Sequence, residues 1–468
     1  MACLATARER PNVLFIAIDD LRTELGCYGV KHAPTPNLDR LAGQGVAFTR
    51  HFVQVPTCGA SRYALLTGRS PSESGVTRSN AAAYAGASAL SAKQLPGAQT
   101  FPELFRRSGY RTVLIGKISH TADGRVFAYN GQGDGRDELP HAWDDYATPL
   151  GQWKRGWGIF FAYANGKHRE DGGGHKDLMD FTVEKDEDLP DGLMAQKAIA
   201  KLAQLKEGGK PFLMGLGFFK PHLPFVAPRQ DWEAVAKMDV PAPTHPDPIK
   251  SPYSHGSGEF FKYNTPYEKS RPLARANALM AKRAYLSCVR YTDRQVGRVL
   301  DALRKLGLAD NTIVVVWGDH GWFLGEVGLW AKHTPFERAV HSPLIIRAPK
   351  IIKKPGRTSD ALAETLDIYP TLLELCRPSF SKTQHPLGGV SLVPVLTGAK
   401  KTVRDTAVSY WGNATTVRTS THRFICKTVK DKRKDLALYD LRSELDPIEN
   451  LAKKNPKLVQ ELLKKLPR

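Results

Sequence analysis

Acidic residues follow two apolar runs that have the length and composition of buried strands. Asp19 and Asp20 come directly after NVLFIAI, and Asp319, followed by His320, comes after NTIVVVWG. In an open α/β sheet, ligands bind beyond the carboxyl ends of the strands. Three carboxylates close together repel one another unless a cation holds them, and their oxygens suit Ca²⁺ first and Mg²⁺ next. An Asp-Asp pair alone is more often a helix cap, but two strand-end clusters in one chain favour a metal site.

A further reactive candidate stands in VPTCGASRYALLTGRSP, residues 55–71, where Cys58 precedes Arg62 at the start of an expected helix. A lone cysteine in this position is more often a small buried hydrophobic residue than a nucleophile. A cysteine-protease arrangement would need a partnering histidine and a third orienting group, and the sequence does not exclude one. The six cysteines form no disulfide framework and no CxxC zinc motif. Cys58 is therefore either core filling or part of a reactive site.

The string around Cys58 resembles the signature of the type I sulfatases, in which Cys-x-Pro/Ala-x-Arg with a trailing Leu-Thr-Gly-Arg directs oxidation of the cysteine to Cα-formylglycine. Ala60 stands where proline is commoner in that signature. The resemblance covers nearly the whole chain and includes PNVLFIAIDDLR, TPNLDRLAGQGVAFTRHFV, GKISH, KPHLPF, WGDHGWFLGEVGLWAKHTPFERAVHSPLII and LYDLRSELDPIENLA. The wording of IAIDDLR, KPHLPF and GDHGWFLGE is most similar to the iduronate-2-sulfatase branch. The resemblance implies a sulfuric ester hydrolase.

The resemblance also implies one Ca²⁺ per chain and a modified residue 58. The implied metal ligands are Asp19, Asp20, Cys58 in its modified form, Asp319 and His320. A hydrated aldehyde at position 58 has two geminal hydroxyls, one to attack sulfur and one whose deprotonation lets sulfate leave by C–O cleavage. Because charge spreads over the sulfate oxygens, the site also needs fixed cations, and the resemblance assigns these to Arg62, Lys117 and Lys332.

Two histidines carry the implied proton transfers. His120, in GKISH, matches the histidine that contacts the formylglycine hydroxyl and helps to expel sulfate, and His222, in KPHLPF, matches the general acid at the leaving oxygen. Lys220 and His333 are candidate substrate contacts. Taken singly, each lysine or histidine could equally be an ordinary loop residue.

The charge balance indicates the class of substrate. Lys and Arg number 67 against 47 Asp and Glu, a net charge of +20, which favours polyanionic partners. The basic residues are dispersed and no nucleic-acid-binding motif is present, so we expect no nucleic acid partner. A sulfated, uronate-containing glycan fits best, and marine galactans or ulvan-like polymers fit as well. The loop 151–170 is expected to offer aromatic faces for sugar rings and cations for neighbouring anionic groups, although Trp153, Trp157 and Phe160 could equally pin the loop to the core.

Strand and helix patterns alternate over the first three-quarters of the chain, which predicts an α/β fold with helices on both faces of a parallel sheet. The resemblance makes this an alkaline phosphatase-like, mostly parallel sheet. Two long irregular stretches, 120–190 and 221–270, are expected to build the substrate site. The stretch 377–402 has the composition of a linker. We expect a catalytic domain over 1–380 and a small α+β domain over 381–468, with strands in TAVSYWG, TTVRTSTHRFICK and LALYDL and a final helix in NPKLVQELLKKL.

Membrane insertion is not expected, because no apolar stretch approaches the ~20 residues of a spanning helix. The N-terminus, MACLATARER, lacks the charged start and apolar stretch of a signal peptide. For a glycan sulfatase we expect export to a periplasmic, extracellular or lysosome-like compartment, with the signal absent or removed. A second expected partner is the maturation enzyme that generates formylglycine.

Two other functions remain open at this point. One is a phosphodiester or phosphonate monoester hydrolase of the same superfamily, some members of which share the formylglycine group. The other is a catalytically silent polyanion-binding protein that keeps an unmodified thiol at position 58. The intact set of acids, lysines and histidines argues against the second.

Overall fold

The computed structural model describes residues 10–78, 88–127, 133–254 and 258–467. Its largest element is an eight-stranded sheet with the order β10-β2-β9-β8-β1-β6-β3-β4. All neighbours in this sheet are parallel except β9, which runs antiparallel to β2 and to β8. The strands are β1 (Asn12–Ile18), β2 (Val46–Phe52), β3 (Arg111–Gly116), β4 (Asp145–Tyr146), β6 (Phe212–Phe218), β8 (Thr312–Gly318), β9 (Leu344–Arg347) and β10 (Arg357–Glu364).

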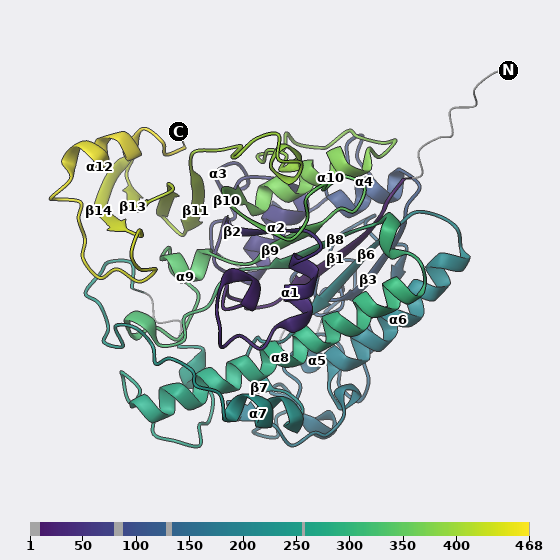
Figure 1. The fold of residues 1–468 in the computed structure, drawn as a ribbon, viewed down its shortest axis with the longest axis horizontal. Helices are drawn as coiled ribbons and strands as arrows, with labels where there is room; N and C mark the ends of the chain where they lie inside the picture. Colours follow the sequence, from purple (N-terminus) through teal and green to yellow (C-terminus); the bar gives the residue numbers. More distant parts are fainter. Residues whose placement is uncertain (1–9, 79–87, 128–132, 255–257, 468) are drawn as a thin grey trace.

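Both faces of this sheet are covered, which is why its central strands are continuous apolar runs. Side chains alternate along β1: Leu14, Ile16 and Ile18 belong to one core, and Val13, Phe15 and Ala17 belong to the other. The first core is closed by α1 (Pro36–Ala42), α6 (Pro190–Glu207) and α8 (Arg275–Lys305). The second is closed by α2 (Cys58–Thr67), α4 (Phe101–Arg107) and α10 (Ile368–Cys376). Figure 1 shows α6 and α8 below the strands and α2, α4 and α10 above them. The predicted α/β architecture is confirmed.

Short elements fill the connections between the strands and the longer helices. They are α3 (Pro71–Ser74), α5 (Trp157–Phe160), α7 (Arg229–Ala236), α9 (Glu337–Val340), α11 (Val393–Leu396) and the paired strands β5 (Met179–Asp180) and β7 (Phe225–Val226). The stretch with the composition of a linker, 377–402, contains α11, and its Leu392, Val395 and Leu396 are buried in the second core. This part of the chain therefore packs with the large sheet, and the domain boundary at 380 stays a prediction.

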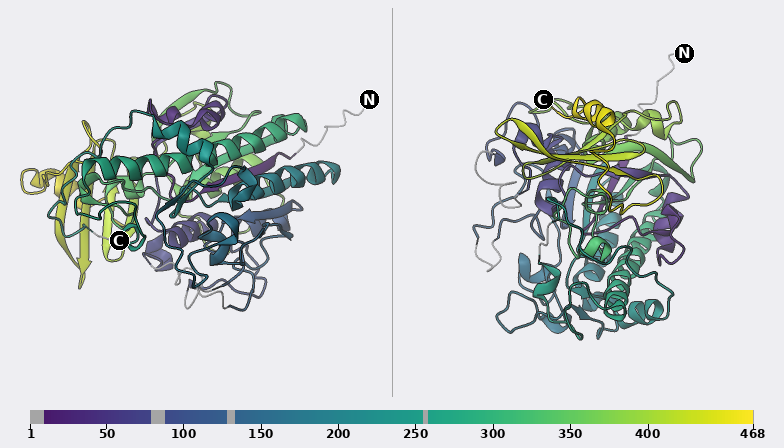
Figure 2. Two further views of the ribbon diagram at one scale, coloured as in Figure 1. Left: turned by 90° about the horizontal axis from the view of Figure 1, so that it is seen from below. Right: turned by 90° about the vertical axis from the view of Figure 1, so that its left-hand side faces the viewer.

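The C-terminal part forms a separate antiparallel sheet, β11 (Ala407–Trp411), β12 (Ala414–Arg418), β13 (His422–Val429) and β14 (Lys432–Asp440), followed by α12 (Pro456–Leu463). Figure 2 shows it at one end of the large sheet. The sequence TTVRTSTHRFICK was predicted to form one strand, and this was wrong. The chain turns at 419–421, so that β12 and β13 are two strands that pair antiparallel. Buried Glu337 of α9 binds Arg418 and Arg423 at 3.0 and 2.7 Å and so ties this sheet to the rest.

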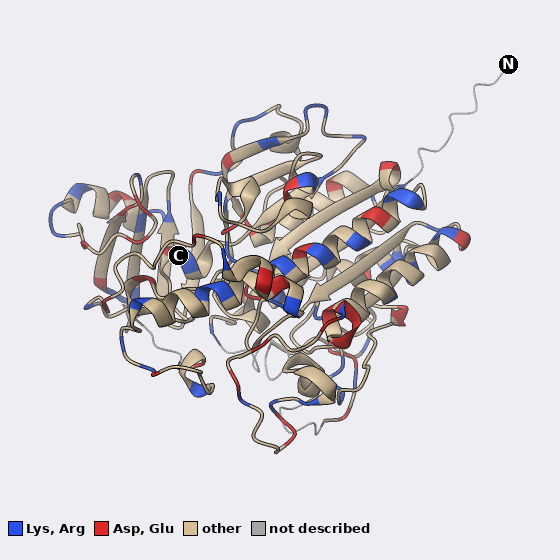
Figure 3. Cartoon of the chain, turned by 60° about the horizontal axis from the view of Figure 1, so that its bottom comes forward, with Lys and Arg blue, Asp and Glu red and all other residues tan. Residues whose placement is uncertain are grey.

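Basic side chains are spread over many helices, strands and loops (Figure 3), in line with the dispersal seen in the sequence. Within the described ranges, no helix is both long enough and apolar enough to cross a membrane.

Candidate active site

The acidic residues meet because β1 and β8 are parallel neighbours in register. Ile18 lies opposite Gly318, so Asp19 and Asp319 leave the sheet side by side. The amide of Asp319 donates to the carbonyl of Ile18, and the amide of Asp20 donates to Oδ1 of Asp319 at 3.0 Å. Asp20 has a φ of 58°, a left-handed conformation that turns the chain sharply at this point. The predicted cluster of three carboxylates at the carboxyl edge of the sheet is therefore present in the structure.

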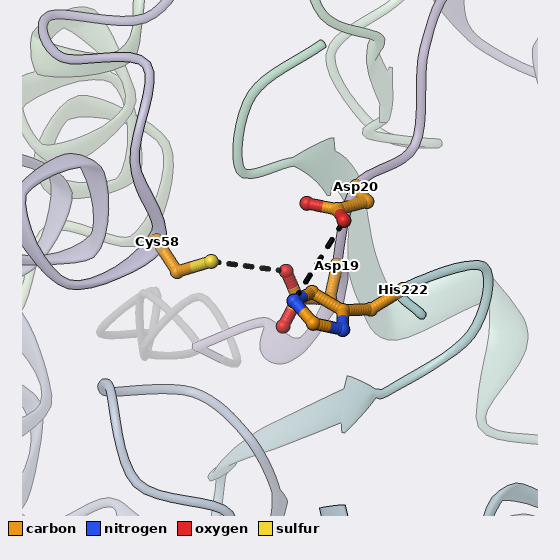
Figure 4. Close-up of side chains that lie close together, drawn as sticks. All are labelled: Asp19, Asp20, Cys58 and His222. Atoms are coloured by element: carbon orange, nitrogen blue, oxygen red, sulfur yellow. Dashed lines mark hydrogen bonds and ion pairs between the residues drawn. The ribbon is translucent and has the colours of Figure 1, made fainter. Parts of the chain in front are cut away.

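Cys58 is the first residue of α2 and lies against this cluster. Its Sγ is 3.3 Å from Oδ1 of Asp19, 3.2 Å from Nε2 of His320 and 3.4 Å from Nζ of Lys332. In Figure 4, Cys58 points at Asp19 while His222 approaches Asp20 from another loop. Burial and the charge of Asp19 raise the pKa of the Cys58 thiol well above its usual value. A reactive cysteine needs a lowered pKa, so this geometry does not support a cysteine-protease type of thiol nucleophile.

Each carboxylate of the cluster also has a buried cation beside it. Lys117, which directly follows β3, binds Asp19 through its ammonium group. Lys332 lies 2.8 Å from Oδ1 of Asp20, and Nε of Arg62 lies 3.0 Å from Oδ2 of Asp319. Arg62, one helical turn after Cys58, also donates to the carbonyl of Lys117. The three cations predicted for sulfate binding thus converge on the same few atoms as Cys58.

A divalent cation fits this set of donors. Ligand atoms of Asp19, Cys58, Asp319 and His320 all lie within 4.8 Å of one another, and so do those of Asp19, Asp20, Cys58 and His222. Burial, with the charges of Asp19, Glu259 and Asp319, raises the pKa of Asp20 well above its usual value despite the nearby Lys332. This crowding of carboxylates is what a bound cation relieves.

His320 is set up as a neutral ligand. Burial lowers its pKa to about 4. Its Nδ1 lies 3.0 Å from the carbonyl of Gly321, so Nδ1 carries the proton and Nε2 presents its lone pair to the cluster. The oxygen-rich donor set with one imidazole favours a hard divalent ion.

The two predicted proton-transfer histidines lie on loops around Cys58. Nδ1 of His222 donates to the carbonyl of Leu223 at 2.7 Å, which leaves Nε2 3.8 Å from Asp20 and 3.5 Å from Glu259. Nδ1 of His120 is buried and has no hydrogen-bond partner among the described residues. Burial and the charge of Lys117 lower the pKa of His120 well below its usual value. Burial and the charge of Lys332 do the same to the pKa of His222. Both rings are therefore neutral before an anion binds.

These groups line a cavity of about 640 Å³. Six predicted residues face it, namely Cys58, Lys117, His120, His222, Lys332 and His333. Its other lining residues were missed in the sequence and come from the two long irregular stretches, which were expected to build the site: Phe161, Arg169, Glu170, Lys176, Glu259, Lys262 and Tyr263. Trp157 and Phe160 are buried yet also line the cavity, whereas Nε1 of Trp153 donates to the carbonyl of Tyr163 inside the loop. Trp153 thus has the pinning role considered for it.

The two candidate substrate contacts differ in position. His333 lines the cavity and stacks on Trp411 of β11, with ring centroids 5.0 Å apart. Lys220 is buried, and its Nζ donates to the carbonyls of His222 and Pro224 at 3.0 and 2.6 Å. Lys220 therefore holds the loop that carries His222, a position that does not favour substrate contact.

Comparison with known proteins gives the family. A family model described as "Sulfatase" matches residues 11–377. The chain belongs to the sulfatase family. A second model, described as "N-sulphoglucosamine sulphohydrolase, C-terminal", matches residues 325–468 of this sulfatase. The resemblance drawn from the Cys58 string is thus confirmed, and the protein is a sulfuric ester hydrolase.

Named relatives agree with this assignment. A "Sulfatase" of Formosa agariphila is 33% identical to this sulfatase over 388 residues, which cover 78% of this chain and 69% of the relative. The "Iduronate 2-sulfatase" of Homo sapiens is 30% identical over 403 residues, 83% of this chain and 68% of its own.

A solved structure confirms the alkaline phosphatase-like fold. A phosphonate monoester hydrolase from Silicibacter pomeroyi superposes with a TM-score of 0.75, covering 97% of this chain and 94% of its own, at 22% identity. At that identity the likeness concerns the fold alone and carries no information about the ester that this chain hydrolyses.

Proposed function

We propose that this sulfatase removes an O-sulfate group from a sulfated, uronate-containing glycan, with Cys58 converted to Cα-formylglycine and one Ca²⁺ bound beside it. The position of Sγ of Cys58, between Asp19, His320 and Lys332, is the observation that carries the proposal. It puts the side chain of residue 58 against both the carboxylate cluster and the cations. The name of the human relative, "Iduronate 2-sulfatase", and the +20 charge of the chain support a sulfated glycan as substrate.

The modified residue and the metal ion would supply chemistry that the encoded side chains lack. A hydrated formylglycine provides a geminal hydroxyl as nucleophile and a second hydroxyl for release of sulfate. Asp19, Asp20, Asp319 and His320 would hold the Ca²⁺, which would supply Lewis-acid polarisation of a sulfate oxygen.

The chain's own residues bind and orient the ester. Lys117 and Lys332 point their ammonium groups at the cluster and bind the sulfate oxygens as charge develops on them. Arg62 fixes Asp319 and the backbone carbonyl of Lys117, so that both keep their places as the ester binds. The rings of Trp157 and Phe160 close one side of the cavity and exclude water.

Proton transfer falls to the two histidines. The ester adds negative charge beside His222, which favours its protonated form and lets Nε2 donate to the leaving sugar oxygen. His120, whose Nδ1 is buried and has no partner among the described residues, is positioned to accept a proton from a hydroxyl at residue 58. Release of the sugar thus depends on His222, and release of sulfate depends on His120.

The direct test measures sulfate release from defined sulfated oligosaccharides. The protein is produced together with a formylglycine-generating enzyme, and the peptide that contains residue 58 is checked by mass spectrometry for an aldehyde or its hydrate. We expect free sulfate from at least one uronate-containing oligosaccharide and none with Cys58→Ala. If the aldehyde is present and no glycan loses sulfate, the glycan assignment is wrong.

Side-by-side kinetics address the remaining alternatives. We expect faster hydrolysis of nitrophenyl sulfate than of a nitrophenyl phosphodiester, and a large preference for the phosphodiester would overturn the proposal. An unmodified thiol together with glycan affinity unchanged by Cys58→Ala would instead indicate a silent polyanion-binding protein. Export to a periplasmic, extracellular or lysosome-like compartment is part of the proposal, and fractionation of the producing organism tests it.

A further inference from the structure

Beyond the groups around Cys58, the cavity carries a second set of cations. Arg169, Lys176 and Lys262 line the same cavity as Cys58 but lie on the loops around 161–178 and 260–263. We refer to these three residues as the outer cation group. Nothing in the sulfate chemistry proposed above uses them.

Two aromatic rings connect the sulfate-binding end with the outer cation group. Nζ of Lys117 lies 4.1 Å from the ring centroid of Phe160, and the centroids of Phe160 and Phe161 are 4.7 Å apart. The guanidinium carbon of Arg169 then lies 3.3 Å from the centroid of Phe161. The two charged ends are thus linked through two rings, so they lie close enough together for substituents on one sugar or on two linked sugars. The rings also fix both cations in place.

Arg169 is held rigidly with one edge open. Its Nη1 donates to the hydroxyl of Tyr263 at 2.9 Å, and its Nε donates to Oε1 of Glu170 at 2.7 Å. Its Nη2 has no hydrogen-bond partner among the described residues, and 21% of the side chain is exposed. A guanidinium fixed in this way keeps a planar donor edge for an anion and loses little entropy on binding one.

The two lysines leave the outer cation group with a net positive charge. Lys176 and Lys262 are exposed at the cavity wall, and neither forms an ion pair with another described residue. Glu170 offsets one of the three charges. The other acid of the wall, Glu259, lies near His222 and Lys332, at 3.5 and 3.9 Å. Among the described residues that line the outer end of the cavity, cations therefore outnumber acids.

We propose that Arg169, Lys176 and Lys262 form a second anion subsite, which binds a carboxylate or a second sulfate of the same substrate molecule. Arg169 supplies directional, charge-assisted hydrogen bonds, and the two lysines supply charge. The proposal rests on the proposed function, since it assumes that the ester sulfate lies near Lys117 and Lys332. According to this proposal, the substrate is a sugar with at least two anionic groups. One is the sulfate that is hydrolysed, and the other binds to the outer cation group.

Three matched sugar sulfates test the subsite. The first is a monosulfated neutral hexose glycoside, the second has a carboxylate at C6, and the third has a second sulfate there. Their dissociation constants are measured by calorimetry on the Cys58→Ala protein. The same measurement is made on three variants of that protein, which carry Arg169→Ala, Arg169→Lys or the double change Lys176→Ala/Lys262→Ala. Lys167→Ala is the matched control, because Lys167 is exposed in the same loop but does not line the cavity. Turnover of the same sugars is measured with Cys58 intact.

We expect Arg169→Ala to weaken binding of the two dianionic sugars about 10- to 100-fold. The dissociation constant of the monosulfated hexose glycoside should change by no more than about twofold. Arg169→Lys recovers part of the loss, and the double lysine variant shows a smaller loss of the same pattern. The carboxylate and disulfate sugars together show which second anion is preferred. Equal losses on all three sugars, or no preference of the parent protein for dianionic sugars, would overturn the subsite. Selective binding without release of sulfate by the intact protein would contradict the proposed function and leave the subsite standing.

Discussion

Nζ of Lys332 lies 2.8 Å from Oδ1 of Asp20 and 3.4 Å from Sγ of Cys58. One ammonium group thus contacts both a carboxylate of the candidate metal site and the residue expected to become the nucleophile. Burial opposes charge on Lys332, but Asp20, Cys58 and Glu259 raise its pKa well above its usual value. Lys332 is therefore charged at neutral pH and couples sulfate binding to the carboxylate cluster.

We expect Lys332→Ala to lower kcat/KM for sulfate esters by about 10²- to 10³-fold, because a preorganised donor to the developing charge is lost. In the metal-free protein the variant also leaves Asp20 buried without its cation, a change that costs about 3–5 kcal/mol of unfolding free energy in buried pairs. Steady-state kinetics and urea denaturation measure the two effects. Lys354→Ala, at an exposed lysine that does not line the cavity, should change neither. A loss of stability without loss of activity would contradict the assigned role.

Calcium is expected to stabilise the folded protein and to be needed for sulfate release. Removal with a chelator should abolish activity and lower the melting temperature, and added Ca²⁺ should restore both. At a free Ca²⁺ concentration of a hundred times its Kd, binding to the folded protein raises the unfolding free energy by about 2.7 kcal/mol. Asp20→Asn should reduce the shift in melting temperature. If Ca²⁺ leaves the melting temperature of the chelated protein unchanged, the metal assignment is wrong.

The core of the fold could be predicted from the sequence because its strands are continuous apolar runs. β1 and β8, buried on both faces, stand out as NVLFIAI and TIVVVWG, and the acids that follow them indicate the functional edge. β10, an edge strand with the sequence RTSDALAE, was missed because charged and hydroxyl residues interrupt any apolar run. The turn between β12 and β13 was missed because it contains neither glycine nor proline.

Within the site, the predictable residues were those in short motifs next to strands and helix starts. Asp19 and Asp319 follow from the ends of two parallel strands in register, and Cys58 follows from the resemblance of the string around it to the sulfatase signature. Arg169 and Glu259 were not predictable, because their positions depend on the conformations of long loops. The stacking of His333 on Trp411 joins positions far apart in the sequence, and no local pattern signals it.

The loss of activity on replacing His222 should depend on the leaving group of the ester. His222→Gln removes the group placed to protonate a sugar oxygen, so we expect sulfate release from a sugar ester to fall about 10²- to 10⁴-fold. Nitrophenolate leaves without protonation, so hydrolysis of nitrophenyl sulfate should fall far less. His245→Gln, at an exposed histidine paired with Glu444, serves as the control. Equal losses on both esters would show that His222 binds sulfate or metal and does not act as a general acid.

A buried ion group away from the cavity should set part of the pH dependence of stability. Arg404 lies 3.0 Å from Glu364 and also binds Asp367, and the amide of Val408 donates to Glu364 at 2.7 Å. Burial and the charge of Asp367 raise the pKa of Glu364 from 4.5 to about 7, although Arg404 opposes the shift. A carboxyl with a raised folded-state pKa binds its proton more tightly in the folded chain. Its contribution to stability is therefore complete below about pH 4.5 and is lost as the pH rises through about 7.

We expect the unfolding free energy, measured by urea denaturation, to fall between about pH 5 and pH 8 by up to roughly 3 kcal/mol from this group, at about 1.4 kcal/mol per pKa unit. Glu364→Gln keeps the size of the side chain and an acceptor for the Val408 amide but cannot titrate, so its stability should fall less over the same range. Glu374→Gln, at an exposed position of α10, should follow the parent protein. If the unfolding free energies of the parent protein and of Glu364→Gln change by the same amount from pH 5 to pH 8, Glu364 stays ionised and Arg404 outweighs the effect of burial.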